Sequence, residues 1–159
     1  MNLTKMQIPW IVSLILSFIA LTFMYSLTYY KVDLSIFGEI HFTFMDISFG
    51  STKYVLGANR ELLELSWVNL LGVVFVGLGI VSAIMKLAVK SCRKLKLTSY
   101  LAFILLVAAS IIVITSSNYV VTTDGDSINL ITEPIVVLTF LITLTSASMF
   151  LIAEVYNKK

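Results

Sequence analysis

The sequence predicts a mainly α-helical membrane protein: a four-transmembrane-helix antiparallel bundle with a small extracytoplasmic β-sheet of about five strands. The chain is 58% hydrophobic and only 13% charged, whereas charged residues make up about a quarter of a typical soluble domain. Its mean hydropathy is +0.98. The hydrophobic residues gather in four stretches, and segments rich in β-branched and aromatic residues lie between them. We therefore expect a single membrane domain over residues 1–159.

Each hydrophobic stretch is long enough to cross a bilayer. They cover residues 8–30, 67–85, 101–117 and 135–153, and none of them contains Asp, Glu, Lys, Arg or His. A helix rises about 1.5 Å per residue, so about 20 residues match a hydrocarbon core of about 30 Å. We expect helices at about 8–30, 67–89, 99–117 and 134–155. The first is interpreted as a retained anchor, because its apolar run exceeds a signal core and no A-x-A-like site follows.

The charges predict the orientation of these helices. Eight of the 11 basic residues lie at the two ends of the chain and in the segment between the second and third helices, together with the single acid Glu154. The other two connections hold three basic and eight acidic residues. Short loops rich in Lys and Arg stay in the cytoplasm. We expect a multi-pass protein of the cell membrane with both termini cytoplasmic.

The basic segment between helices two and three is interpreted as an orientation and headgroup-binding element. Each cation near an anionic membrane surface contributes about 1 kcal/mol of attraction. Five cations beside a membrane are too few to predict a nucleic-acid partner. The residues are Lys86, Lys90, Arg93, Lys94 and Lys96.

Small residues predict how the helices pack. Lipid tails are as apolar as leucine, so helices associate through close packing at small residues and through interhelical hydrogen bonds. Each stretch carries such residues at helical spacing, on one face. They are Ser13, Ser17, Ala20, Gly72, Gly79, Ala83, Ala102, Ala109, Ser116, Thr139, Thr143 and Ala147. We expect a dry helix interior, which argues against a pump, transporter or channel.

The first outer loop, residues 31–66, is too long for a bare connection and is predicted to fold. Strands at 34–37, 40–49 and 53–56 would form a meander, and residues 58–66 would form a short helix with Asn59 as a possible N-cap. The second outer loop, residues 118–133, predicts a hairpin with strands 119–123 and 127–131 around Asp124 and Gly125.

The long strand at 40–49 has apolar residues on both faces, which switch near its middle. A bulge at Met45 and Asp46 would bring both halves onto one buried surface. Without a bulge, half of these apolar side chains would face outward and could contact a partner. This predicts a partner-binding surface made of Ile40, Phe42, Phe44, Met45, Ile47 and Phe49.

The sequence predicts no cofactor and no metal site. The only histidine, His41, is interpreted as a polar strand residue, and the single cysteine, Cys92, cannot form an intramolecular disulfide. Structural zinc sites need about four ligands. Asp124-Gly125-Asp126 resembles the start of a calcium loop, but the later glutamate is missing, so the turn interpretation is preferred.

Two functions remain open. The first is a non-enzymatic membrane protein whose outer module and helix faces bind partner subunits or copies of itself. The second is an accessory subunit of a respiratory or transport complex. An enzyme is not expected, since no spacing pairs a nucleophile with a base.

Four helices with both ends inside and a strand-rich first outer loop resemble the layout of claudin-type proteins. That layout implies a structural, partner-binding role in a membrane. The family's first-loop signature, a tryptophan followed by Gly-Leu-Trp and two cysteines, is absent. No residue role therefore carries over from the resemblance.

Overall fold

Four long helices make up most of the protein. The computed structural model describes residues 7–33, 39–55, 58–89, 96–120, 122 and 130–156. The helices are α1 (Gln7–Ser26), α3 (Trp67–Ala88), α5 (Lys96–Thr115) and α6 (Ile135–Tyr156). Each contains a span long and apolar enough to cross a membrane. The mainly helical fold of a multi-pass membrane protein is therefore confirmed at this level.

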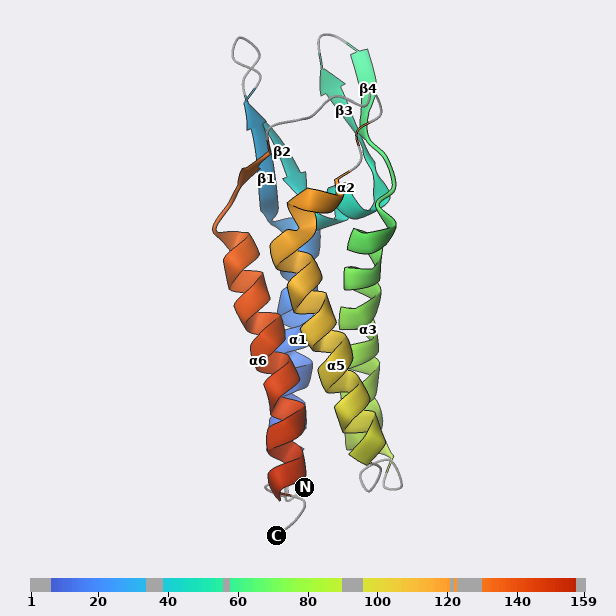
Figure 1. The fold of residues 1–159 in the computed structure, drawn as a ribbon, viewed down its shortest axis with the longest axis vertical. Helices are drawn as coiled ribbons and strands as arrows, with labels where there is room; N and C mark the ends of the chain where they lie inside the picture. Colours follow the sequence, from blue (N-terminus) through green and yellow to red (C-terminus); the bar gives the residue numbers. More distant parts are fainter. Residues whose placement is uncertain are drawn as a thin grey trace.

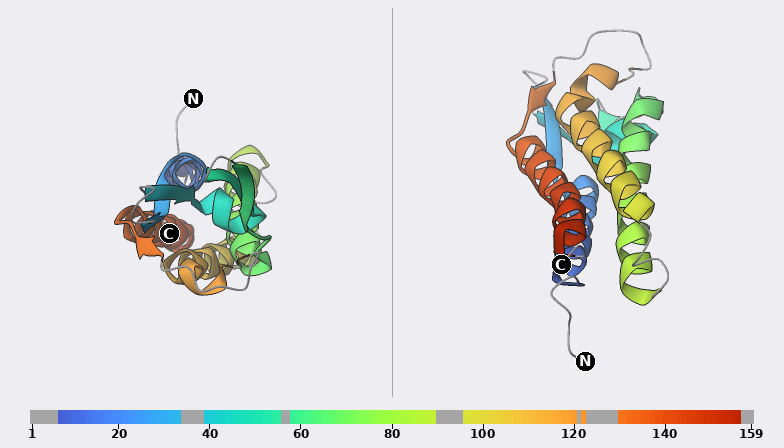
Figure 2. Two further views of the ribbon diagram at one scale, coloured as in Figure 1. Left: turned by 90° about the horizontal axis from the view of Figure 1, so that it is seen from above. Right: turned by 60° about the horizontal axis from the view of Figure 1, so that its bottom comes forward.

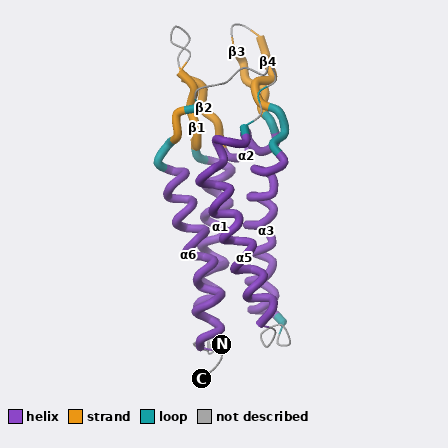
Figure 3. Tube along the Cα trace, viewed as in Figure 1, coloured by secondary structure: helices purple, strands orange, loops and turns teal. Residues whose placement is uncertain are grey.

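The four helices lie side by side (Figures 1 and 2). Helices α1 and α5 each contact both α3 and α6. Helix α1 begins and α6 ends at the lower end of Figure 1, and the strands lie at the upper end (Figure 3). We call these two ends of the protein the lower end and the upper end.

Strands β1 (Thr28–Asp33), β2 (Glu39–Thr43) and β5 (Ile131–Thr132) form one antiparallel sheet in the order β2-β1-β5. Strand β1 follows α1 almost directly, so the helix predicted at 8–30 is too long at its C-terminal end. The register between β1 and β2 shifts between Thr28 and Tyr30. This irregularity allows the adjacent residues Tyr29 and Tyr30 both to be buried, whereas neighbours on a regular strand face opposite sides.

The predicted strand at 40–49 is wrong beyond Thr43. Helix α2 (Phe44–Phe49) begins there, with Thr43 as its N-cap. The Thr43 side chain accepts from the Asp46 backbone N–H, and Asp46 Oδ2 accepts from the Thr43 N–H at 2.8 Å. This capping box starts a helix despite the β-rich composition. The switch of apolar face in the sequence thus marks a change from strand to helix and not a bulge at Met45.

Strands β3 (Ser51–Val55) and β4 (Ala58–Leu63) form a separate two-stranded hairpin. The predicted helix at 58–66 with Asn59 as its cap is therefore wrong, since Asn59 pairs with Tyr54 in this hairpin. Gly50 joins α2 to β3 with φ of +84°, and a Cβ there would lie 2.7 Å from the Leu63 carbonyl oxygen. Glycine avoids both the strain and the clash.

The prediction of one sheet of about five strands is also wrong. Tyr119 belongs to the 3₁₀ helix η1 (Ser116–Tyr119), and β5 has only two residues. Thr122 makes an isolated bridge to Leu63. The predicted strand at 34–37 and the turn at Asp124 and Gly125 lie outside the described residues. The strands form a three-stranded sheet and a separate hairpin.

The buried side chains form two clusters. The upper cluster lies where the helices meet the strands and includes Tyr29, Tyr30, Phe42, Phe44 and Ile47. The lower cluster contains Trp10, Leu106 and Phe150, packed with alanines of α3, α5 and α6. Small side chains in the lower cluster allow the helices to approach closely.

Candidate functional site

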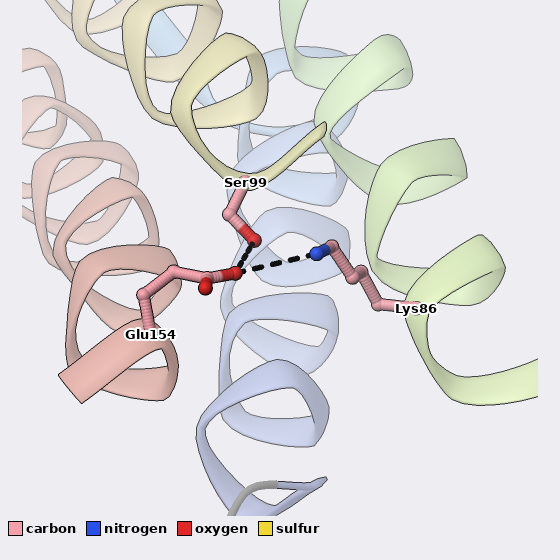
Figure 4. Close-up of polar contacts among 3 residues, drawn as sticks. All are labelled: Lys86, Ser99 and Glu154. Atoms are coloured by element: carbon pink, nitrogen blue, oxygen red, sulfur yellow. Dashed lines mark hydrogen bonds and ion pairs between the residues drawn. The ribbon is translucent and has the colours of Figure 1, made fainter. Parts of the chain in front are cut away.

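A buried ion pair joins α3 to α6 at the lower end. The Lys86 Nζ lies 3.3 Å from Glu154 Oε1 (Figure 4). Lys86 is fully buried and Glu154 is 3% exposed. Charged side chains inside membrane helices are costly and are commonly paired. Lys86 and Glu154 offset this cost for each other, because their opposite charges lie within contact distance.

The other two helices complete the site. The Ser99 hydroxyl of α5 donates to the same Glu154 oxygen at 2.5 Å (Figure 4). The Lys86 ammonium lies 5.4 Å from the ring centroid of Trp10 in α1, a cation–π distance. Each of the four helices therefore supplies one side chain. We call these four residues the lower polar site.

Two polar atoms in the lower polar site have no hydrogen-bond partner: Glu154 Oε2 and the indole Nε1 of Trp10. The free carboxylate oxygen points away from Ser99 and Lys86 (Figure 4). Burying an unpaired polar atom costs about 1–3 kcal/mol. Ser99 is fully buried, so its hydroxyl is closed to a substrate in this conformation. The geometry fits a contact that joins helices.

This site corrects two expectations. Lys86 was assigned to headgroup binding, but its ammonium is buried against Glu154. The helix interior was expected to be free of ionisable groups, but the observed α3 and α6 extend past the predicted apolar stretches and include this pair. Of the other four basic residues, Lys96 is exposed at the start of α5, and Lys90, Arg93 and Lys94 lie outside the described residues.

A signal for the lower polar site was present in the sequence. The small-residue stripes continue onto it with helical spacing. Lys86 follows Ala83 by three residues, Glu154 follows Ala147 by seven, Ser99 precedes Ala102 by three, and Trp10 precedes Ser13 by three. Residues at these spacings share one helix face.

The residues selected for helix packing all lie in the interior. Every one of the twelve is buried. Ser146 of α6, which the spacing argument omitted, lies 2.8 Å from the hydroxyls of both Ser13 and Ser17 of α1 and also donates to the Ser13 carbonyl. A Cβ on Gly72 would lie 2.9 Å from Ile112 of α5. These contacts join α1 to α6 and α3 to α5.

Half of the residues predicted to bind partners belong to the protein's own core. Phe42, Phe44 and Ile47 are at most 1% exposed, so a partner cannot contact them in this conformation. The reason is the turn into α2, which directs Phe44 and Ile47 inward. Phe49 is 56% exposed, and Ile40 and Met45 are partly buried. Only these three can take part in an outer contact.

Buried hydrogen bonds fix the strands to the helices at the upper end. The Tyr29 hydroxyl donates to Thr139 of α6 at 2.6 Å, and the Tyr30 hydroxyl contacts Ser116 at 2.5 Å. Asn69 Nδ2 donates to the Ser116 carbonyl oxygen at 3.2 Å, while Asn69 Oδ1 is buried without a partner. Burial raises the pKa of both tyrosines, with the hydroxyl contacts acting in the opposite direction.

His41 lies beside a shallow hollow at the upper end. The hollow has a volume of about 430 Å³, and its lining also includes Glu133 and Thr28. Beside it, Lys31 forms ion pairs with Glu133 at 3.4 Å and Glu39 at 3.5 Å. The hydrogen bond to Glu133 and the charge of Glu39 raise the Lys31 pKa. Among the described residues, no three His, Cys, Asp or Glu side chains gather in a metal-binding group.

Comparison with known proteins finds no matching family, no matching curated protein and no matching solved structure. A function for this chain therefore has to be inferred from its own chemistry and geometry.

Proposed function

We propose that the protein is a non-enzymatic, integral cell-membrane protein whose extracytoplasmic module binds partner subunits or copies of itself. In this proposal the four helices form an antiparallel bundle with both termini in the cytoplasm. The excess of basic residues in the two chain ends and in the segment between α3 and α5 supports this orientation. The buried Lys86–Glu154 pair is neutral overall, so it leaves that charge asymmetry unchanged.

The observation that carries the proposal is the exposed Phe49 of the outer module. Phe49 is 56% exposed at the end of α2. Trp67, the first residue of the membrane-spanning candidate in α3, is 71% exposed. The hydrogen bonds of Tyr29 and Tyr30 hold the strands on the helices. Aromatic side chains on a fixed support are typical anchors of protein interfaces.

Photo-crosslinking in intact membranes tests this proposal. A photoreactive amino acid at position 49 is compared with the same group at Ile104, which is 60% exposed in the middle of α5. We expect a protein adduct at position 49 and mainly lipid adducts at position 104. The proposal is wrong if position 49 gives only lipid adducts.

One observation favours the second candidate, an accessory subunit of a multi-subunit respiratory or transport complex. A Cβ on Gly77 of α3 would have no atom within 4 Å, and Val74 and Val81 on either side are 44% and 50% exposed. A glycine between β-branched residues allows another membrane helix to approach closely. Native mass measurement after mild extraction separates the candidates: a larger complex with other chains supports the accessory subunit, and multiples of this chain support self-association.

A further inference from the structure

The shallow hollow at the upper end lies where two membrane-spanning candidates reach their limits. Leu27 follows the last residue of α1, and Ile135 is the first residue of α6; both line the hollow together with Pro134. The membrane-spanning candidates cover Gln7–Ser26 and Ile135–Val155. With these two spans in the hydrocarbon core, the hollow lies at the depth of the lipid headgroups.

The lining combines apolar and polar groups in a way that suits a headgroup. Leu27, Pro134 and Ile135 supply an apolar side, and Thr28, His41 and Glu133 supply polar atoms. Thr28 and His41 can donate hydrogen bonds to phosphate oxygens, whereas the Glu133 carboxylate can only accept. A ligand that satisfies all three carries both an anionic and a cationic group.

The local charge favours one kind of headgroup. Lys31 is paired with both Glu39 and Glu133, so these three residues together carry a formal charge of −1. This excess of negative charge would repel an anionic headgroup, whereas a headgroup with a primary ammonium can pair with the Glu133 carboxylate. Ion pairs reinforced by hydrogen bonds are stronger than neutral contacts.

We propose that this hollow binds the headgroup of an aminophospholipid, with its ammonium on Glu133 and its phosphate near Thr28 and His41. The apolar side formed by Leu27 and Ile135 contacts the glycerol and the start of the acyl chains. A lipid is favoured over free phosphoethanolamine because the lining residues Leu27 and Ile135 lie at the ends of the membrane-spanning candidates of α1 and α6.

Native mass measurement of the purified protein tests this proposal. The protein is mixed with equal amounts of phosphatidylethanolamine and phosphatidylglycerol that have identical acyl chains. We expect retention of phosphatidylethanolamine to exceed that of phosphatidylglycerol by roughly 10-fold or more, the ratio that a hydrogen bond to a charged group supplies. Glu133→Gln removes the carboxylate at nearly constant size and should bring the two lipids close to equal retention.

Glu39→Gln is the matched control. It also removes one of the two carboxylates on Lys31 and changes the local charge by the same amount, but Glu39 does not appear in the lining of the hollow. This variant should keep most of the preference for phosphatidylethanolamine over phosphatidylglycerol. A second variant, His41→Gln, alters an exposed side chain and should weaken retention of both lipids several-fold. The melting temperature in lipid-free detergent reports whether each variant folds.

Three results would overturn the proposal. The wild-type protein could retain both lipids equally, or Glu39→Gln and Glu133→Gln could lower the preference by the same factor. Free phosphoethanolamine could also displace the lipid at equal concentration, which would identify a soluble ligand instead.

Discussion

Gly79 of α3 lies directly against Leu106 of α5: a Cβ on Gly79 would stand 2.6 Å from Leu106 Cδ2 and 2.9 Å from its Cγ. Leu106 is fully buried, so it has little room to move aside. Gly79→Ala should therefore lower the free energy of unfolding by about 1–3 kcal/mol, the usual cost of overpacking a core. Unfolding in mixed micelles measures this change.

Gly77→Ala is the control for this prediction, because the same atom is added on the same helix into open space. It should leave the stability unchanged or raise it by up to about 1 kcal/mol through helix propensity. Equal destabilisation by both substitutions would mean that α3 and α5 are not in contact at Gly79.

The lower polar site predicts a large asymmetry between single and double substitutions. Lys86→Met leaves the Glu154 carboxylate buried without its cation, and Glu154→Met leaves the ammonium without its anion. Each should cost about 3–5 kcal/mol of stability. The double variant Lys86→Met with Glu154→Met removes both charges and should cost much less than the sum. A double-mutant cycle measures the coupling, and additive losses would exclude a buried pair.

Ser146 predicts a smaller, local effect. Its hydroxyl joins α6 to both Ser13 and Ser17 of α1, and interhelical hydrogen bonds in membranes contribute about 0.6–2 kcal/mol. Ser146→Ala should destabilise the protein by this amount. The partly exposed Ser82 bonds only the Leu78 carbonyl of its own helix in the described hydrogen bonds, so Ser82→Ala should be nearly neutral. A neutral Ser146→Ala would argue against the α1–α6 contact.

The buried tyrosines predict that stability falls at alkaline pH. Burial raises the pKa of Tyr29 and Tyr30 in the folded protein. Above about pH 10 the unfolded chain therefore loses tyrosine protons that the folded protein keeps. The unfolded state is then favoured, and stability falls by about 1.4 kcal/mol per pH unit for each tyrosine. The pKa of Lys31 is also raised in the folded protein. Loss of its proton therefore also lowers stability once the pH exceeds the ordinary pKa of lysine.

Phe substitutions isolate this effect. Tyr29→Phe and Tyr30→Phe should each lower stability at neutral pH, because Thr139 and Ser116 lose a partner. Each should also make the alkaline decline less steep. Stability curves between pH 8 and pH 12 measure the slopes. Unchanged slopes in both variants would show that these tyrosines are not the groups responsible.

The helices were predictable because their signal depends on composition and length. Stripes such as Ser13, Ser17 and Ala20 repeat along one helix face, and the structure buries all three. The lower polar site was missed for a specific reason. Lys86 and Glu154 lie one step beyond the apolar stretches, where a charged residue indicates a membrane boundary as readily as a buried pair.

The connections at the upper end were less predictable because local propensity and tertiary contacts disagree there. Residues 44–49 have strand composition, but the capping box of Thr43 and Asp46 starts a helix. Tyr29 and Tyr30 continue the apolar stretch of α1, yet they form part of β1 because their hydroxyls pair with Thr139 and Ser116. Pairings between residues distant in the chain do not appear in hydrophobic periodicity.

Thiol labelling in intact cells tests the central claim. This claim is that the strands lie on the outer side of the membrane and that the basic segment between α3 and α5 lies in the cytoplasm. A membrane-impermeant maleimide is applied to the wild-type protein, whose only cysteine is Cys92, and to Phe49→Cys in a Cys92→Ser background. The account predicts labelling at position 49 in intact cells and at Cys92 only after the membrane is opened. Labelling of Cys92 in intact cells, with position 49 protected, would contradict it.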